Sequence, residues 1–251
     1  MERIGLALVA LGLSMGFSIP QEQGSSHYEL RYVKYFNGGN IIAYATEGKG
    51  VIEGRVLYVG KRELRNKRKL ITKDKEVCGR GYKIDKVYEV SEGGGVKNAV
   101  VFVEGVGKPR KVERVLVQKK CDFVPRVMAM GAGSVLEIIN EDAVKHEANG
   151  VQDFETIFKF SQHKKGMKDR VELKKAGVVE ITCNIHGWMK AWVVVVDSDY
   201  YAVTDEKGRF RIEGLPPGEY RIRLWHEGFG EKVKKVKVSE GKATTVTFEL
   251  R

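Results

Sequence analysis

Short β-branched runs, each bounded by glycine, proline or aspartate turns, recur along this 251-residue chain. Residues 177–183 (GVVEITC) and 244–250 (TTVTFEL) are two examples. No long stretch places apolar residues at i, i+3, i+4 and i+7, the spacing of an amphipathic helix. Strand-length runs separated by turn residues are typical of β-sandwiches. The sequence therefore predicts an all-β fold, with enough length for one large or two small domains.

The first 20 residues read as a secretory signal peptide. Arg3 and the free amino terminus give a positive start, and residues 4–15 form an apolar run too short to span a bilayer. Positions 14–16 (SMG) offer a cleavage site with small residues. Because Glu2 weakens the basic start, a retained amphipathic anchor is the alternative. No later stretch is apolar enough for a membrane helix. We therefore expect a periplasmic or extracellular protein with no transmembrane segment after signal removal.

The chain is strongly basic, with a formal charge of +11 at pH 7. Much of the surplus lies in three runs, residues 61–69, 162–170 and 231–237. Such a surface attracts acidic proteins or anionic membrane faces. The runs lack regular aromatic interleaving and match no nucleic-acid-binding module, so we expect no nucleic-acid partner. A solvated charged surface is the simplest interpretation of each run taken alone.

Three potential soft metal ligands, Cys183, His186 and Met189, lie within seven residues. Period-two alternation places Cys183 at the end of a strand, on the same core-facing side as Ile181. The following run, residues 191–196 (AWVVVV), is apolar at every position. Both faces of that strand therefore need cover, from two packed β layers or from two adjoining domains.

A thiolate, imidazoles and a thioether together favour a soft or borderline metal, and blue copper sites combine two His, one Cys and a weak axial Met. His146, which follows the predicted strand 134–140, can supply the second imidazole. One alternative is a buried thiol beside an incidental histidine. Zinc is another, although its sites seldom use a thioether.

The other histidines, at positions 27, 163 and 226, stand alone, and the chain has no His-x-His pair. Multicopper oxidases need several such pairs, so this chain cannot build a trinuclear copper centre alone. Nothing points to the second copper site of a nitrite reductase. We therefore expect a protein that is not an enzyme.

At these residues the chain resembles a cupredoxin, over about residues 112–198. Residues 131–146 resemble the glycine turn, strand and first histidine of that family, and residues 177–189 resemble its penultimate strand and ligand loop. The Cys-x2-His-x2-Met spacing is the short form found in amicyanin. The resemblance implies an amicyanin- or plastocyanin-like site with one type 1 copper ion, held by His146, Cys183, His186 and Met189.

The same resemblance implies roles for the residues of the ligand loop. His186 would lie at the protein edge and pass the electron, and Gly187 and Trp188 would form part of an apolar docking patch around it. Many cupredoxins have Asn directly after the first histidine. Here Glu147 occupies that position and Asn149 follows two residues later. This departure bears on the hydrogen bonding around the ligands and on redox tuning.

The C-terminal part resembles the carboxypeptidase regulatory-like domain, a small transthyretin-like β-sandwich. The resemblance rests on residues 200–229, whose segments 205–208 and 216–218 have good turn chemistry. Elements that usually open this family appear far upstream, as residues 51–56 (VIEGRV) and 98–105 (NAVVFVEG).

We therefore expect a discontinuous regulatory-like domain, with residues 51–106 joining residues 200–251 and a cupredoxin-like domain, 107–199, inserted between them. Simple tandem domains are the alternative. Residues 21–50 would form an N-terminal extension with a hairpin around the Asn-Gly-Gly at positions 37–39.

An exported chain with three cysteines has one left over. As a whole, the chain resembles exported proteins labelled methylamine utilisation proteins, whose pattern also has cysteines near the EVCGRG and KKCDFVP segments. The resemblance implies a disulfide between Cys78 and Cys121, which leaves Cys183 for copper. Two free thiols in an oxidising compartment are the alternative.

The leading hypothesis is an exported single-electron carrier with a blue copper site, working between redox partners. The basic surface favours an acidic partner, such as a cytochrome or a dehydrogenase. One alternative is a copper-binding module for trafficking or storage. Another is an envelope binding or scaffold protein in which the copper site is structural.

Overall fold

The computed structural model describes the backbone of residues 33–35 and 41–43 and the whole of residues 49–251. The chain divides into two compact units, residues 1–46 and 47–251. In the first unit, β1 (Val33–Tyr35) and β2 (Ile41–Ala43) pair antiparallel on either side of the predicted turn. The predicted signal peptide, residues 1–20, lies outside the described residues.

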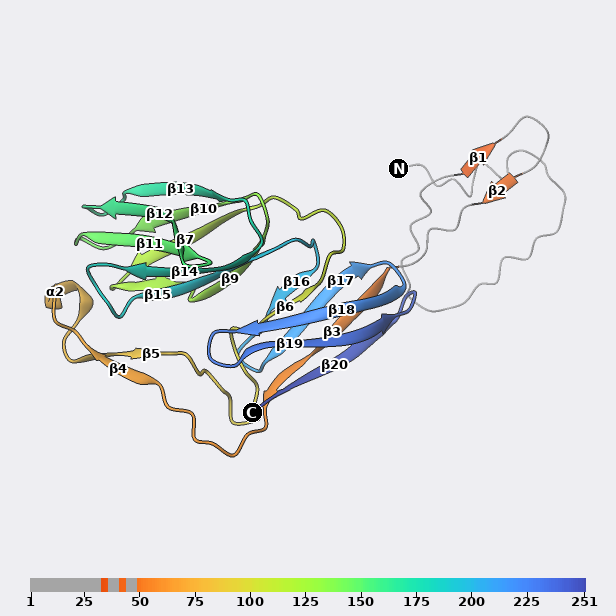
Figure 1. The fold of residues 1–251 in the computed structure, drawn as a ribbon, viewed down its shortest axis with the longest axis horizontal. Coiled ribbons are helices and arrows are strands. Elements are labelled where there is room, and N and C mark those ends of the chain that lie inside the picture. The colour runs from red at the N-terminus through yellow and green to blue at the C-terminus, as the bar shows by residue number, and fades with distance from the viewer. Residues whose placement is uncertain (1–32, 36–40, 44–48) are drawn as a thin grey trace, which may run out of the picture. The chain divides into compact units, whose positions relative to one another are not determined.

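The second unit contains a sandwich of two sheets built from residues 113–196, drawn in green and teal in Figure 1. Its five-stranded sheet has the order β12-β11-β14-β15-β9, and its four-stranded sheet has the order β13-β10-β7-β8. Apolar side chains from both inner faces, such as Leu116, Leu136 and Ile181, form one buried core between them. The strands are β7 (Glu113–Lys119), β8 (Asp122–Val124), β9 (Val127–Gly131), β10 (Ser134–Asn140), β11 (His146–Gln152), β12 (Glu155–Gln162), β13 (Lys168–Leu173), β14 (Gly177–Cys183) and β15 (Lys190–Val196).

A second sandwich combines strands from both ends of this unit (Figure 1). One sheet has the order β16-β6-β18-β19 and the other the order β17-β3-β20. Strand β3 pairs in parallel with the last strand, β20, from Val51 opposite Ala243 onward. The strands are β3 (Gly50–Tyr58), β6 (Val100–Val103), β16 (Tyr201–Val203), β17 (Arg209–Leu215), β18 (Gly218–His226), β19 (Gly230–Val238) and β20 (Ala243–Leu250).

Strand β15 is buried on both faces because each face meets a different cluster. Val193 and Val195 belong to the core of the first sandwich. Val194 and Val196 alternate with them and pack in a cluster with Trp225 of β18. Strand β9 pairs with β15 in parallel, and its side chains alternate between the same two clusters. This double cover explains why residues 191–196 are apolar at every position.

A buried charge cluster accompanies this contact. The Arg126 guanidinium donates to both carboxylate oxygens of Glu227, at 2.6 and 2.7 Å, and to the Asp85 carboxylate at 2.6 Å. Trp192 donates its indole N–H to Glu227 at 2.9 Å. The side chains of Arg126, Glu227 and Asp85 are 15%, 3% and 9% exposed, so each charge depends on its partners for solvation.

Residues 61–86, which we call the strap, join neither sandwich sheet although they fall within the range 51–106. They contain β4 (Lys67–Leu70), the short helix α2 (Lys75–Cys78) and β5 (Tyr82–Asp85), with β4 and β5 paired antiparallel. A disulfide between Cys78 and Cys121 fastens the strap to the first sandwich. These are the two cysteines that the resemblance paired. Strands of four residues cannot bury a core of their own, so the strap depends on contacts with the sandwich, such as this disulfide, for its stability.

Candidate metal centre

Two neighbouring strands and one turn bring the candidate ligands together. His146 is the first residue of β11 and Cys183 the last residue of β14. The two strands are antiparallel, with Ala148 opposite Cys183, so both residues lie at the same end of the sheet. His186 and Met189 follow in the turn to β15, which is closed by a hydrogen bond from the Met189 N–H to the His186 carbonyl at 2.9 Å.

Three ligand atoms converge on one point. The Nδ1 atoms of His146 and His186 lie 3.0 Å apart. The Cys183 Sγ atom lies 3.9 Å from the first of these nitrogens and 3.7 Å from the second. Cys183 is 2% exposed and both histidines are 0% exposed. Met189, 1% exposed, belongs to the same core cluster as Cys183.

Each histidine has a carboxylate behind it. His146 Nε2 lies 2.9 Å from the Asp142 Oδ2 atom, and His186 Nε2 lies 2.8 Å from the Asp74 Oδ2 atom. A carboxylate accepts the Nε2–H, so the Nδ1 atom of a neutral ring carries a lone pair. Two such lone pairs facing each other at 3.0 Å repel, unless a proton or a cation lies between them.

The Cys183 thiol is strongly acidified. Burial alone would raise its pKa, but hydrogen bonds with His146 and His186 and with the backbone N–H groups of Glu147 and His186 outweigh burial and lower the pKa to about 5. Burial lowers the pKa of His186, but its contacts with Cys183 and Asp74 outweigh that effect and raise it. The buried centre therefore places an acidified thiol against two histidine rings.

These donors fit copper. A thiolate and two imidazole nitrogens in a buried cluster, with a thioether in the same core, form the donor set of a type 1 site. The Sγ–Nδ1 separations of 3.7 and 3.9 Å suit ligands about 2 Å from a shared ion. Within residues 49–251, each other group of three close metal-binding side chains shares His146 or His186 with this cluster.

Glu147 links the two ligand segments. Its backbone N–H donates to Cys183 Sγ at 3.5 Å. Its carboxylate accepts from the Asn184 side chain at 2.9 Å, and its carbonyl accepts from the Asn184 backbone N–H at 3.0 Å. The sequence departs from the family's Asn at position 147, yet the two loops are tied together by this pair.

The expected docking patch around His186 is not at the surface. His186 is fully buried and Trp188 is 6% exposed, with its indole N–H donating to the Cys121 carbonyl at 3.0 Å. Only Gly187 is exposed, and the Lys69 ammonium of the strap donates to its carbonyl at 3.0 Å. The expected edge position of His186 is therefore wrong for this structure, because the strap covers the ligand loop.

The disulfide belongs to the same neighbourhood. The sulfur atoms of Cys78 and Cys121 and a ring nitrogen of His186 lie within 4.8 Å of one another. Asp142 connects this region to His146. Its carboxylate lies 2.9 Å from His146 Nε2 and also accepts the backbone N–H groups of Lys120 at 2.6 Å and Cys121 at 2.8 Å. The strap attachment and both ligand histidines thus share one hydrogen-bonded framework.

Two of the remaining histidines lie within the described residues. His163 is exposed. His226 is buried in β18, accepts the Gly228 N–H at its Nδ1 atom, and has a pKa lowered to about 4, chiefly by burial. His27 lies outside the described residues.

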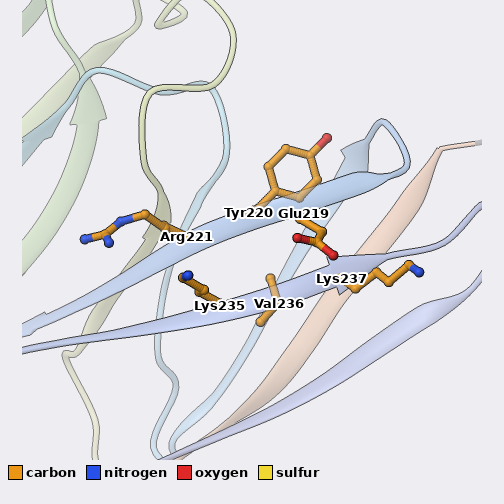
Figure 2. A pocket seen from close by; sticks show the side chains of 6 residues that line it. All are labelled: Glu219, Tyr220, Arg221, Lys235, Val236 and Lys237. Atoms are coloured by element: carbon orange, nitrogen blue, oxygen red, sulfur yellow. The ribbon is translucent and has the colours of Figure 1, made fainter.

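A surface hollow on the second sandwich is not a comparable site. Figure 2 shows that its side chains come from the neighbouring strands β18 and β19. Most of them are exposed, and the hollow has no buried charged or polar side chain. It is lined by Glu219, Tyr220, Arg221, Lys235, Val236 and Lys237.

Comparisons with known proteins match different parts of the chain. The family model of the carboxypeptidase regulatory-like domain matches residues 189–251. Amicyanin from Paracoccus versutus is 17% identical, with a TM-score of 0.30, and the match covers 38% of this chain and 96% of that one. A purple cupredoxin from Nitrosopumilus maritimus is 17% identical, with a TM-score of 0.29 and coverage of 32% and 97%. No curated protein matches the chain.

A copper-containing nitrite reductase (NirK) from Thermus scotoductus SA-01 is 25% identical, with a TM-score of 0.29. The match covers 36% of this chain and 23% of the reductase, so the chain spans less than a quarter of that protein's length. The chain is thus an all-β protein whose residues 189–251 match the carboxypeptidase regulatory-like family model, and its similar solved structures include cupredoxins.

Sequence reasoning did not identify Asp74, Asp142 or the Glu147–Asn184 pair as parts of the site. Asp142 had a local signal, since it precedes His146 by four residues in the turn after β10. Asp74 had none, because 112 residues separate it from His186.

Proposed function

We propose that the chain is an exported type 1 copper protein that carries single electrons between redox partners and has no enzymatic activity of its own. The observation that carries this proposal is the convergence of the Nδ1 atoms of His146 and His186 and the Sγ atom of Cys183 in a buried cluster. His146, Cys183 and His186 would hold the copper ion, with Met189 as the axial ligand. When bound, copper supplies a one-electron couple between Cu(I) and Cu(II).

The residues around the ligands favour fast electron transfer because they hold the ligands in place. Asp142 and Asp74 fix both imidazole rings, and two backbone N–H groups fix the thiolate. Buried ligands tied in this way keep nearly the same positions whichever charge the metal carries. Little then has to rearrange when an electron arrives or leaves.

Loading the protein with Cu(II) tests the site. We expect an intense blue colour with one copper ion per chain, lost in Cys183→Ser and kept in His163→Ala, which removes an exposed histidine. A colourless protein that binds one equivalent of Cu(II) would contradict a type 1 site.

Voltammetry separates the carrier from the copper-trafficking alternative. A carrier gives a reversible one-electron wave and keeps its copper in the presence of a Cu(I) chelator. A trafficking module gives up Cu(I) readily. We favour the carrier because neither histidine has any exposed surface through which an acceptor could compete for the metal.

Export is part of the proposal, based on the N-terminal sequence. Within the described residues, no helix is long and apolar enough to span a membrane. Sequencing the amino terminus of the protein recovered from the periplasm or medium tests this part. We expect a new terminus near residues 16–20, and a protein retained in the cytoplasm with its first residues intact would contradict export.

A further inference from the structure

A single hydrogen bond connects the buried ligand cluster to the surface of the strap. His186 has no exposed surface, and its Nε2–H donates to Asp74 at 2.8 Å. The Asp74 side chain is itself 39% exposed. A partner that exchanges electrons with the centre can therefore contact Asp74 on the strap. It cannot contact Trp188 in the same way, because Trp188 is buried.

The two strands of the strap have distinct faces. On the inner face, Lys69 donates to the Gly187 carbonyl at 3.0 Å and Lys83 donates to the Lys120 carbonyl at 2.7 Å. Asp85, on the same face, accepts from Arg126 at 2.6 Å. These contacts fix which side of the ribbon faces the sandwich, and hence which side faces outward.

The outer face, which we call the strap face, is apolar at its centre. Leu70 lies opposite Tyr82, and Arg68 lies opposite Ile84. Leu70, Tyr82 and Ile84 are 54%, 54% and 57% exposed, and the Arg68 guanidinium lies 4.4 Å from the Tyr82 ring centroid. Of nine exposed large hydrophobic side chains in the described part of the chain, three gather on these two four-residue strands. Such clustering is typical of an interaction surface.

Positive charge borders this apolar centre at its Leu70 end. The strap carries 11 Lys and Arg against four Asp and Glu, a surplus of seven out of the chain's formal charge of +11. Lys73, Lys75 and Arg80 are all exposed. Lys75 and Arg80 line a hollow together with Leu70, which joins the cationic rim to the apolar patch.

Building on the proposed electron-carrier function, we propose that the strap face is the docking surface for an acidic one-electron redox protein, and that the Asp74–His186 hydrogen bond connects this surface to the ligand cluster. A small apolar centre with a charged rim is the usual composition of a transient protein interface. The opposite charge of the partner speeds encounter and orients it over Asp74. An anionic membrane satisfies the charge but has no one-electron centre to exchange with.

Binding to a plant-type ferredoxin, an acidic one-electron protein, tests the proposal without copper. The metal-free protein is passed over immobilised ferredoxin at low salt, together with the triple variant Lys73→Glu, Lys75→Glu, Arg80→Glu. A matched triple variant on the second sandwich, with charge reversals at three exposed lysines, gives the same net charge. The lysines of the matched variant are Lys235, Lys237 and Lys242.

We expect the strap variant to weaken ferredoxin binding at least tenfold and the matched variant to weaken it less than twofold, because steering by a local patch changes association by tenfold or more. Leu70→Ser with Ile84→Ser should weaken binding without changing charge. Equal losses in both triple variants would overturn the proposal, as would no binding by the unaltered protein. If the strap variant loses binding to phosphatidylglycerol vesicles but keeps its binding to ferredoxin, the strap face is a membrane-binding surface. That result would also overturn the proposal.

Electron transfer is measured separately on the copper-loaded proteins. We expect the rate constant for oxidation of reduced ferredoxin to fall at least tenfold in the strap variant, while its voltammetric wave stays that of the unaltered protein. A strap variant that oxidises ferredoxin at the unaltered rate would overturn the docking surface. Absence of a reversible wave in the unaltered protein would instead contradict the carrier function, and the metal-free binding results would still decide the docking surface.

Discussion

The acidified thiol at the ligand cluster makes the stability of the metal-free protein depend on pH, and replacing Cys183 with Ser removes that dependence. The pKa of Cys183 is lowered from 9.0 to about 5 in the folded protein. Between these values the folded state binds fewer protons than the unfolded state, so stability rises with pH. The contribution is complete above pH 9 and is lost as the pH falls through about 5.

The contribution of the thiolate to the unfolding free energy follows from the interval between the pH and the two pKa values. At pH 7 the thiolate lies about two units above its folded pKa, and at 1.36 kcal/mol per unit it contributes about 3 kcal/mol. At pH 5 it contributes less than about 0.5 kcal/mol. The raised pKa of His186 describes the same contact from its other side, so the interaction is counted once. The difference in unfolding free energy between the unaltered protein and Cys183→Ser should therefore grow by about 2 kcal/mol from pH 5 to pH 7.

Urea unfolding of the metal-free proteins at pH 5, 6 and 7 measures this difference, and ultraviolet absorbance of the thiolate gives the pKa directly. Met189→Leu is the matched control, because it alters the same turn without removing a titrating group. A difference between Cys183→Ser and the unaltered protein that stays constant from pH 5 to pH 7 would refute the reasoning. So would a thiol that ionises near pH 9.

Three further outcomes are expected. Arg126→Met should lower the unfolding free energy by about 3–5 kcal/mol in urea titrations, because it removes the buried cation that pairs with the Glu227 and Asp85 carboxylates; a loss below about 1 kcal/mol would contradict that account. Asp142→Asn should raise the reduction potential by about 50 mV, or roughly 1 kcal/mol, because the oxidised centre loses a nearby negative charge; an unchanged or lower potential in voltammetry counts against it. Cys78→Ala with Cys121→Ala should lower stability by about 4 kcal/mol for a separation of 43 residues and speed the loss of copper to a chelator, since the strap loses its anchor; equal release rates would show that the strap does not restrict the metal.

The alternation of apolar and polar residues was sufficient to predict the site where the ligands and strands lie in one continuous segment of the sequence. The sequence predicts a strand that ends at Cys183 and an apolar strand over residues 191–196, and the structure has β14 ending at Cys183 and β15 beginning at Lys190. Alternation in β14 placed Cys183 on the buried face, where it lies. The all-β class followed from the same signals, because strand periodicity and turn residues are written in neighbouring positions.

The covering of the ligand turn by the strap was not predictable from local sequence, because the two segments are far apart in the chain. Residues 61–69 looked like a solvated charged run, and most of their side chains are exposed, yet Lys69 reaches the ligand turn. Nothing in the sequence near Asp74 or His186 indicates that the two will meet. The burial of His186 depends on where the strap settles, which is decided by a disulfide and a few hydrogen bonds between distant residues.

The double cover of β15 and β9 limits how far the sandwich that holds the ligand cluster can be treated as a portable module. A fragment cut at residues 107 and 199 would place Val127, Val194 and Val196 in water, although all three are now buried. It would also leave behind the strap, and with it Asp74 and Cys78. Such a fragment should self-associate through the uncovered sheet, so grafting or evolutionary shuffling of this centre has to carry the neighbouring sandwich with it.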